Sequence, residues 1–301
     1  MSKKLFFVFN PHSGKAQIKN KLLEILDIFV KNSWTVTVHP TQNAQDAYET
    51  VRSCAADYDL LVVSGGDGTL NEAIRGVMSV KRERRPEIGY IPAGTTNDFA
   101  SSLKIPKSMT RAAENIMTGH IFRCDVGNFN NGKYFTYVAA FGAFTDVSYE
   151  TPQEKKNLLG QTAYFLEGIK KLHTLKSEHI RVCYGDTEFE DDFIFGMVSN
   201  TNYVGGFETA KAFKAQLNDG LFEVVLIKRP KSLLDVQELI SNIVTQQITS
   251  DAFCIFKTDN VRFISDKSLQ WTLDGEYGGS FDTVDIKTEK EAVTLVLGER
   301  K

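Results

Sequence analysis

Residues 60–72 read LLVVSGGDGTLNE, and this stretch decides the fold of the first half of the chain. Leu60–Val63 is a continuous apolar run, typical of a strand buried on both faces of a parallel sheet. Three glycines follow, at Gly65, Gly66 and Gly68, and glycine is the residue that a tight turn favours. Apolar residues then recur at helical spacing, so the stretch predicts a strand, a turn and a helix in direct succession. The apolar residues of that helix are Leu70, Ala73, Ile74, Val77 and Met78.

The same alternation of strand and helix extends over residues 1–122. Further apolar runs predict strands at Leu5–Phe9, Trp34–Val38 and Ile88–Ile91. Helical spacing predicts helices after the first two of these strands and a last one near Ser108–Thr118. Alternating strands and helices predict an open, doubly wound α/β domain with a parallel sheet.

From about Ile121 the pattern changes to short β-rich runs separated by turn signals such as Asp219-Gly220 and Asp274-Gly275. These runs predict a C-terminal antiparallel β-sandwich-like domain over residues 123–290. No long linker separates the two domains, so we expect them to pack closely with a cleft between them. The last run, within residues 291–301, is compatible with either domain. Strands are expected at Tyr134–Ala140, Ile180–Tyr184, Phe193–Ser199, Leu221–Ile227, Ala252–Lys257, Val261–Ile264, Val284–Ile286 and Ala292–Leu297, and helices near Lys155–Leu172 and Leu233–Thr249.

The composition is that of an ordinary globular protein, with 42% hydrophobic and 24% charged residues among 301. A net charge of −3 argues against a nucleic-acid partner. The apolar run Leu5–Phe9 is too short for a signal peptide, and no run approaches the ~18 apolar residues of a membrane span. Four cysteines without metal-site spacing suit a reducing compartment, so we expect a cytoplasmic protein.

The glycine-rich turn indicates a phosphate site. It places main-chain N–H groups and the positive end of a helix at one point, at the edge of a sheet where ligands bind. Asp67 would repel a phosphate unless a divalent cation lies between them, so it indicates Mg²⁺ or a water network; the alternative is a plain turn with Asp67 as a helix cap. The turn is not a Walker A loop. The segment nearest to that motif is NPHSGK at residues 10–15, which lacks the first glycine of a Walker A loop and its final Ser or Thr.

Three segments carry a resemblance to a known family. GGDGTLNE at residues 65–72 resembles the nucleotide-binding signature shared by diacylglycerol, sphingosine and NAD kinases. NPHSGK at residues 10–15 and IPAGTTNDFA at residues 91–100 resemble two further signatures of the lipid kinases, and the NAD-kinase motif of the second domain is missing. On these motifs the chain is identified as a member of the diacylglycerol kinase catalytic-domain family of bacterial soluble lipid kinases, and the likeness extends through the second domain.

The resemblance implies a transferase of phospholipid biosynthesis that uses ATP and Mg²⁺ to phosphorylate diacylglycerol to phosphatidic acid. The enzyme would be cytoplasmic, would meet its lipid peripherally at the inner face of the membrane, and would form a homodimer as its relatives usually do. Two alternatives stay open: a kinase for another lipid alcohol, such as phosphatidylglycerol or a sphingoid base, and a nucleotide-binding regulator without catalysis.

The resemblance also makes the first domain the nucleotide-binding domain, places the active site in the cleft between the two domains, and assigns residues position by position. Asp67 and Glu276 take catalytic roles, with Glu276, in the segment LDGE at residues 273–276, as the general base. Local sequence alone favours a plain Asp-Gly hairpin turn there, and Lys15 could equally be an exposed residue that opens a helix. The residues assigned to the nucleotide are Asn10, Ser13, Gly14, Lys15, Thr41, Gly65, Gly66, Gly68, Thr69, Asn71, Glu72 and Thr95.

A structural Mg²⁺ is implied in the second domain. The carboxylate of Asp219 would bind it together with the main-chain carbonyls of Gln216 and Leu221, which suits a hard cation. Asp125 matches an acidic position in the network that leads to this metal. The basic run Lys81–Arg85 is expected to be a solvated loop, with contact to anionic lipid as the alternative.

Overall fold

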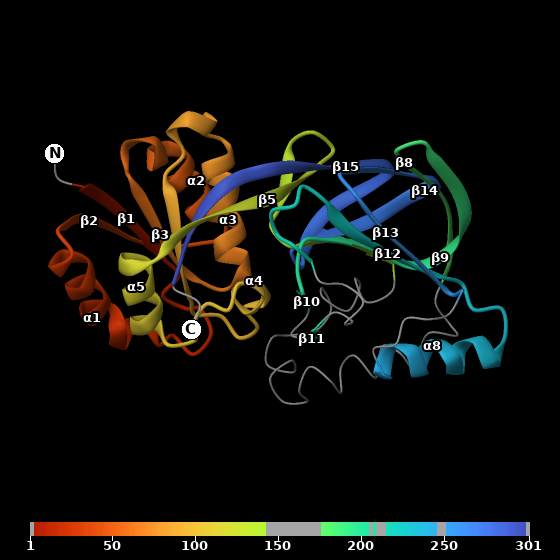
Figure 1. Ribbon diagram of the computed structural model, residues 1–301, viewed down its shortest axis with the longest axis horizontal. Coiled ribbons are helices and arrows are strands. Elements are labelled where there is room, and N and C mark those ends of the chain that lie inside the picture. Colours follow the sequence, from red (N-terminus) through yellow and green to blue (C-terminus); the bar gives the residue numbers. More distant parts are fainter. Residues whose placement is uncertain (1–2, 143–175, 205–206, 209–214, 246–250, 299–301) are drawn as a thin grey trace. The chain divides into compact units, whose positions relative to one another are not determined.

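The computed structural model describes residues 3–142, 176–204, 207–208, 215–245 and 251–298. The chain forms two compact units, one made of Met1–Val126 and Glu289–Lys301 and the other of Gly127–Thr288 (Figure 1). The predicted boundary, after residue 122, lies just before the observed division. The predicted helix near Lys155–Leu172 lies outside the described residues.

The first unit contains a parallel sheet in the order β2-β1-β3-β4, and the C-terminal part of β15 adds a further parallel strand beside β4, with Leu295 opposite Ile88. Its strands are β1 (Lys3–Phe9), β2 (Trp34–Pro40), β3 (Leu60–Gly65) and β4 (Glu87–Pro92). Its helices are α1 (Ile18–Lys31), α2 (Asp46–Cys54), α3 (Asp67–Met78), α4 (Asp98–Ser102) and α5 (Met109–Thr118), with short 3₁₀ turns η1 (Ala55–Asp57) and η2 (Arg82–Arg84). The predicted doubly wound α/β fold is confirmed.

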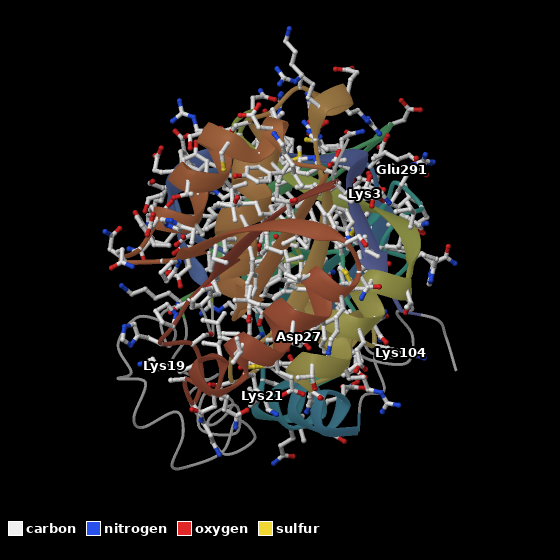
Figure 2. The ribbon with its side chains drawn as sticks, turned by 90° about the vertical axis from the view of Figure 1, so that its left-hand side faces the viewer. Lys3, Lys19, Lys21, Asp27, Lys104 and Glu291 are labelled. Carbon is white, nitrogen blue, oxygen red and sulfur yellow. The ribbon has the colours of Figure 1, made fainter. Side chains whose placement is uncertain are left out.

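The alternation of side chains along β1 explains how helices cover both faces of this sheet. Leu5, Phe7 and Phe9 point to one face and pack in a core with the buried side of α1 and with α5. Buried positions on α1 are Ile18, Ile25 and Phe29, whereas Lys19, Lys21 and Asp27 lie on its solvent side (Figure 2). On the other side α2 packs against α3, closely enough that a Cβ at Gly76 would lie 2.8 Å from the Val51 side chain.

The second unit is antiparallel and β-rich, as predicted. Its long strands β9 and β14 each pair with β7 at one end and with β8 at the other, and β12 and β13 extend the sheet beyond β9. Two strands, β5 and β15, pass from one unit into the other. The elements are β5 (His120–Phe129), β6 (Lys133–Phe135), β7 (Val138–Gly142), β8 (Glu178–Tyr184), β9 (Thr187–Ser199), β10 (Tyr203–Val204), β11 (Phe207–Glu208), β12 (Phe222–Lys228), α8 (Leu233–Thr245), β13 (Phe253–Thr258), β14 (Asn260–Leu273) and β15 (Glu276–Leu297).

An aromatic core holds the second unit together. Trp271 is 1% exposed and its ring centroid lies 4.8 Å from Phe141, 5.3 Å from Phe263 and 5.4 Å from Phe129. Aromatic pairs at such separations add about 0.5–1.5 kcal/mol each beyond the area they bury. These four rings come from β14, β7 and β5, so one cluster ties together strands that are distant in sequence.

The basic run Lys81–Arg85 is not a free patch of charge. Arg82 donates hydrogen bonds to the main-chain carbonyls of Lys290 (3.2 Å) and Glu291 (2.8 Å). Arg85 donates to the carbonyls of Val80 (3.0 Å), Met78 (3.3 Å) and Ala292 (2.7 Å). Both guanidinium groups therefore hold residues 290–292 in place within the first unit.

No helix among the described residues is long and apolar enough to cross a membrane.

Candidate active site

The three sequence motifs of the first unit meet at the carboxyl edge of its parallel sheet. The Asn10 N–H donates to the Ser64 carbonyl (2.9 Å), and the Ala93 N–H donates to the Gly65 carbonyl (2.8 Å). A Cβ placed on Gly94 would lie 2.6 Å from the Gly66 Cα, so only glycines allow these two loops to touch. The loops that follow β1, β3 and β4 thus form one continuous main-chain surface.

Gly14 completes this contact on the side of β1. Its φ of +55° is in the left-handed region that favours glycine, and a Cβ there would overlap the carbonyl oxygen of Ala93. Ser13, which is buried, lies beside the same place, because its Oγ is 3.6 Å from the Cβ position of Gly66. The predicted residues Asn10, Ser13, Gly14, Gly65 and Gly66 are therefore brought together.

Asn97 and Tyr90 fix the loop that follows β4. Asn97 has φ +56°, and its side-chain amide both accepts the Gly94 N–H (2.9 Å) and donates to the Gly94 carbonyl (2.7 Å). The Tyr90 hydroxyl donates to the Gly65 carbonyl (3.1 Å). Burial and the neighbouring Asp67 raise the pKa of Tyr90 far above its ordinary value, so this hydroxyl remains a hydrogen-bond donor.

Asp67 joins two helix N-termini. It is the first residue of α3, and its carboxylate accepts the main-chain N–H groups of Asp98 (3.1 Å) and Phe99 (3.3 Å), the first residues of α4. Burial raises the pKa of the Asp67 carboxyl, against the opposite effect of these main-chain hydrogen bonds. Each carboxylate oxygen keeps acceptor capacity beyond the bond it makes here, which is the capacity that a cation or water would use.

The other predicted nucleotide residues differ in exposure. Gly68 and Thr69 are partly buried in the first turn of α3, and a Cβ on Gly65 would lie 2.5 Å from the Thr69 Cβ. Thr41 is buried, and its N–H donates to the Phe9 carbonyl (2.9 Å), which places it next to Asn10. Asn71 and Glu72 are partly buried further along α3, whereas Lys15 and Thr95 are exposed.

Asp98 is a candidate that the sequence analysis did not assign. Asp98 is 3% exposed, and it follows the loop that contacts Gly66. A buried carboxylate at a phosphate site is a candidate for proton or cation chemistry. Its place in the segment TTNDFA, directly after a predicted strand and loop, was the signal from which it could have been found.

In the second unit, Glu276 follows a two-residue hairpin turn. Asp274 (φ +50°) and Gly275 (φ +85°) form the turn between β14 and β15, so the hairpin that the local sequence favours is present. The Asp274 carboxylate is buried and accepts the N–H groups of Thr136 (2.6 Å), Tyr137 (2.9 Å) and Val138 (2.9 Å). Glu276, the first residue of β15, is exposed.

The predicted metal residues of the second unit share one loop, and a lysine lies beside it. Asp219 accepts the Leu221 N–H (2.9 Å), and the Gln216 carbonyl accepts the Asp219 N–H (3.4 Å). The Lys257 ammonium lies 3.8 Å from the second Asp219 oxygen and 2.8 Å from the buried carboxylate of Glu223. One carboxylate with main-chain carbonyls suits a hard cation with bound waters, but the cation would compete with Lys257.

Asp125 belongs to the first unit. It is fully buried, and one carboxylate oxygen accepts the Glu291 N–H (2.7 Å). Within the described ranges there is no cluster of three or more His, Cys, Asp or Glu side chains arranged to hold a metal ion.

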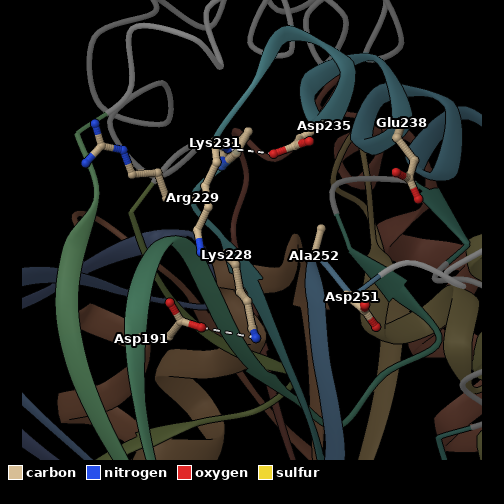
Figure 3. Close-up of a pocket in the computed structure, with 9 residues that line it drawn as sticks. Asp191, Lys228, Arg229, Lys231, Asp235, Glu238, Asp251 and Ala252 are labelled. Atoms are coloured by element: carbon tan, nitrogen blue, oxygen red, sulfur yellow. Dashed lines mark hydrogen bonds and ion pairs between the residues drawn. The ribbon is translucent and has the colours of Figure 1, made fainter.

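A hollow in the second unit does not contain the predicted residues. Its walls carry charges of both signs, and the Lys228 ammonium points at Asp191 with a separation of 3.1 Å (Figure 3). Asp235 accepts the N–H groups of Lys231 (2.7 Å) and Ser232 (3.0 Å) at the start of α8. The Lys228 ammonium and the Asp191 carboxylate therefore pair with each other, and the Asp235 carboxylate is bound by the main chain at the start of α8.

Comparison with known proteins agrees with these features. Residues 4–129 match the family model of the diacylglycerol kinase catalytic domain. Residues 140–296 match the model of the YegS C-terminal NAD kinase beta sandwich-like domain. The first model covers most of the α/β unit, and the second covers the β-rich unit from residue 140 onward together with residues 289–296 of the α/β unit.

Curated relatives match over nearly the whole chain. A diacylglycerol kinase of Bacillus subtilis is 33% identical over 279 residues, which cover 92% of this chain and 91% of that one. A diacylglycerol kinase of Staphylococcus epidermidis is 34% identical over 281 residues, covering 93% and 87%. The fold also matches a crystal structure described as a diacylglycerol kinase from Bacillus anthracis, with a TM-score of 0.82 at 23% identity, over 98% of this chain and 97% of that one.

The chain belongs to the diacylglycerol kinase family and is a lipid kinase, as its three motifs predict.

Proposed function

We propose that this kinase transfers the γ-phosphoryl group of ATP to the primary hydroxyl of diacylglycerol and so forms phosphatidic acid at the inner face of the membrane. The observation that carries the donor half of the proposal is the contact of the glycine loops at Gly14, Gly66 and Gly94 beside the N-terminus of α3. Main-chain N–H groups and the positive end of a helix suit a polyphosphate. The acceptor follows from the curated relatives, which are diacylglycerol kinases.

The reaction requires a base. The lipid hydroxyl oxygen attacks the γ-phosphorus, the bond from that phosphorus to the β–γ bridging oxygen breaks, and ADP leaves with the bond's electron pair. Glu276, exposed at the start of β15, takes the hydroxyl proton, and Asp274 fixes the turn that precedes it. A bound Mg²⁺ would neutralise phosphate charge, and Asp67 is the acidic residue that would hold it at this edge.

The residues of the first unit position the donor. Ser13, Thr69 and the main chain around Gly66 and Gly94 bind the phosphates, and Lys15 is exposed to meet a phosphate or the lipid headgroup. In the second unit, Asp219 with the carbonyls of Gln216 and Leu221 would hold a structural Mg²⁺ in competition with Lys257. Asp125, which the resemblance assigns to the network of this metal, is buried in the first unit.

Glu276→Gln tests the assignment of the base. Turnover with ATP and diacylglycerol in mixed micelles is expected to fall by at least about a hundredfold, because a glutamine cannot accept the proton. ATP affinity, measured by calorimetry, is expected to stay within about twofold, because the nucleotide residues lie in the other unit. A turnover near that of the wild type would refute the role of Glu276.

A panel of lipid acceptors tests the substrate. Radiolabelled ATP is offered with diacylglycerol, phosphatidylglycerol and a sphingoid base in matched micelles, and the labelled product is identified. We expect phosphatidic acid as the main product. Labelling of another lipid in preference would reassign the acceptor, and ATP binding without transfer to any lipid would indicate a regulator.

A further inference from the structure

The loop that follows β2, Thr41–Gln45, is fastened at its start to the first nucleotide motif. The Thr41 N–H donates to the carbonyl of Phe9, the residue before Asn10 (2.9 Å). The Gln42 N–H donates to the carboxylate of Asp46 (2.6 Å), which also contacts His39 and Thr50. The loop therefore begins beside the phosphate loops that follow β1, β3 and β4.

The far end of this loop is fastened to α3, the helix that carries Asp67. The Glu72 carboxylate accepts the Gln45 N–H (2.9 Å). One turn later, Arg75 donates to the Gln45 side-chain oxygen (3.1 Å), and its guanidinium lies 4.8 Å from the centre of the Tyr48 ring. Residues at i and i+3 share one face of a helix, so Glu72 and Arg75 bind the loop from the same face of α3.

Gln45 has a conformation that needs this support. Its φ is +68°, in the left-handed region that residues other than glycine rarely adopt and that persists where the surroundings hold it. Burial raises the pKa of the Glu72 carboxyl, and hydrogen bonds from the main-chain N–H groups of Gln45, Ala47 and Tyr48, at the N-terminus of α2, act in the opposite direction. The carboxylate is thus committed to the loop and the helix behind it, which leaves phosphate binding to the glycine loops.

We propose that Glu72 is a positioning residue that holds the loop Thr41–Gln45 in the shape that receives the nucleoside end of ATP. The phosphates occupy the glycine loops after β1, β3 and β4, and β2 is the next strand outward in the sheet order. The β2 loop therefore borders the phosphate site, and its main chain and the amides of Gln42 and Asn43 offer donors and acceptors for a base or ribose. This inference rests on the proposed binding of ATP at this edge.

The experiment compares two ligands that share phosphates but differ in the nucleoside. ATP and inorganic tripolyphosphate are titrated into the wild type, Glu72→Ala, Glu72→Gln and the control Glu49→Ala. Glu49 is an exposed carboxylate on neighbouring α2 whose partner is Arg52. We expect Glu72→Ala to weaken ATP binding about tenfold, because an N–H loses its acceptor and the loop relaxes. Tripolyphosphate binding is expected to stay within about twofold, since it uses only the glycine loops.

The conservative variant and the kinetics separate positioning from general damage. Glu72→Gln keeps an oxygen for the Gln45 N–H, so we expect it to recover most of the ATP affinity, and Glu49→Ala should match the wild type. In turnover assays the KM for ATP should rise in Glu72→Ala while kcat stays within about threefold. These kinetics decide the matter if tripolyphosphate binds the wild type too weakly to titrate.

Three results would overturn the inference: an unchanged ATP affinity in Glu72→Ala, equal losses for ATP and tripolyphosphate, or a fall in kcat with no change in KM. A wild type that binds no ATP at all would instead refute the proposed function and with it the premise of this inference.

Discussion

Two opposing effects determine the pKa of the Asp67 carboxyl. Burial disfavours its ionised form, whereas the N–H groups of Asp98 and Phe99 favour it. Burial has the larger effect, so the pKa of Asp67 is raised above its ordinary value of 3.8. An ionised Asp67 is thus held at a cost to the folded protein, and a cation placed beside it would relieve that cost.

This balance predicts how stability depends on pH. Between pH 3.8 and the raised pKa, the folded protein binds more protons at Asp67 than the unfolded chain does, so this group's contribution to the free energy of unfolding falls as pH rises. Asp67→Asn removes that dependence. We expect the stability of the wild type relative to the variant to decline with rising pH through this window, in urea titrations without Mg²⁺ and ATP.

The matched control is Asp27→Asn, which changes an exposed carboxylate on α1. Its stability difference from the wild type should reflect only a surface ion pair, worth about 0–1 kcal/mol. A difference between wild type and Asp67→Asn that does not vary with pH would contradict the balance described for Asp67.

The roles of single residues were only partly predictable. The sequence indicated a helix cap or a cation as alternatives for Asp67, and the structure shows a cap that belongs to a different helix, α4. Likewise Glu72, expected beside the nucleotide, caps the loop before α2. Local patterns identify where helices begin, but the partner of a carboxylate depends on which strands become neighbours, and that is a property of the tertiary fold.

At the scale of elements, the hairpin of β14 and β15 is bonded to the segment between β6 and β7. The sequence predicted one strand over Tyr134–Ala140, but the chain forms two, β6 and β7, with a break at Thr136 and Tyr137. The cause is Asp274, whose carboxylate accepts the N–H groups that a continuous ladder would have used. One buried side chain therefore ends one strand and fixes the turn that precedes Glu276.

Asp274→Ala should cost both stability and turnover. Three N–H groups would lose a charged acceptor, so we expect the free energy of unfolding to fall by about 3 kcal/mol. Turnover should fall by more than the loss of folded protein accounts for, because the turn before Glu276 relaxes. ATP affinity should be retained. Urea unfolding, lipid phosphorylation and calorimetry measure the three quantities.

Asp282→Ala is the control for this prediction, since Asp282 is an exposed residue of the same strand, β15. It should change stability by no more than about 0.5 kcal/mol. Equal stability losses in the two variants would contradict the stabilising role given to the hydrogen bonds of Asp274.

The lengths of the strands in the second unit could not be predicted from the sequence either. The apolar runs Val284–Ile286 and Ala292–Leu297 predicted two strands, but both belong to the single strand β15. Polar residues lie between the runs, and Glu291 has φ +48° within the strand. Alternation marks where a strand is buried on one face, and an irregular stretch between two such runs carries no signal.

At the scale of the molecule, the first unit is built from both ends of the described chain. Its sheet gains the C-terminal part of β15 beside β4, and Arg85 fastens that segment through the Ala292 carbonyl while bonding to Met78 and Val80 on its own side. The motifs of residues 10–100 predicted the α/β fold, but they could not decide whether residues 291–301 joined it, because a short apolar run fits either sheet.

Arg85→Ala should therefore loosen the C-terminal strand. We expect a loss of about 2 kcal/mol in the free energy of unfolding and faster amide hydrogen exchange in residues 292–297. Arg84→Ala is the control, because Arg84 lies in the same loop and its side chain contacts η1 at longer distances, 3.4 Å to the Ala56 carbonyl and 3.7 Å to Asp57. Equal effects of the two variants on exchange would contradict the role given to Arg85.

The pairing of Leu295 with Ile88 has a consequence for synthesis of the protein. When the ribosome has made β4, the strand that will cover its open edge does not yet exist, and the entire second unit must be translated first. During that interval the nascent chain exposes a largely apolar edge strand, which is a template for aggregation and a binding site for chaperones. Premature termination would leave this edge permanently open, so truncated products should be insoluble even though every nucleotide motif is complete.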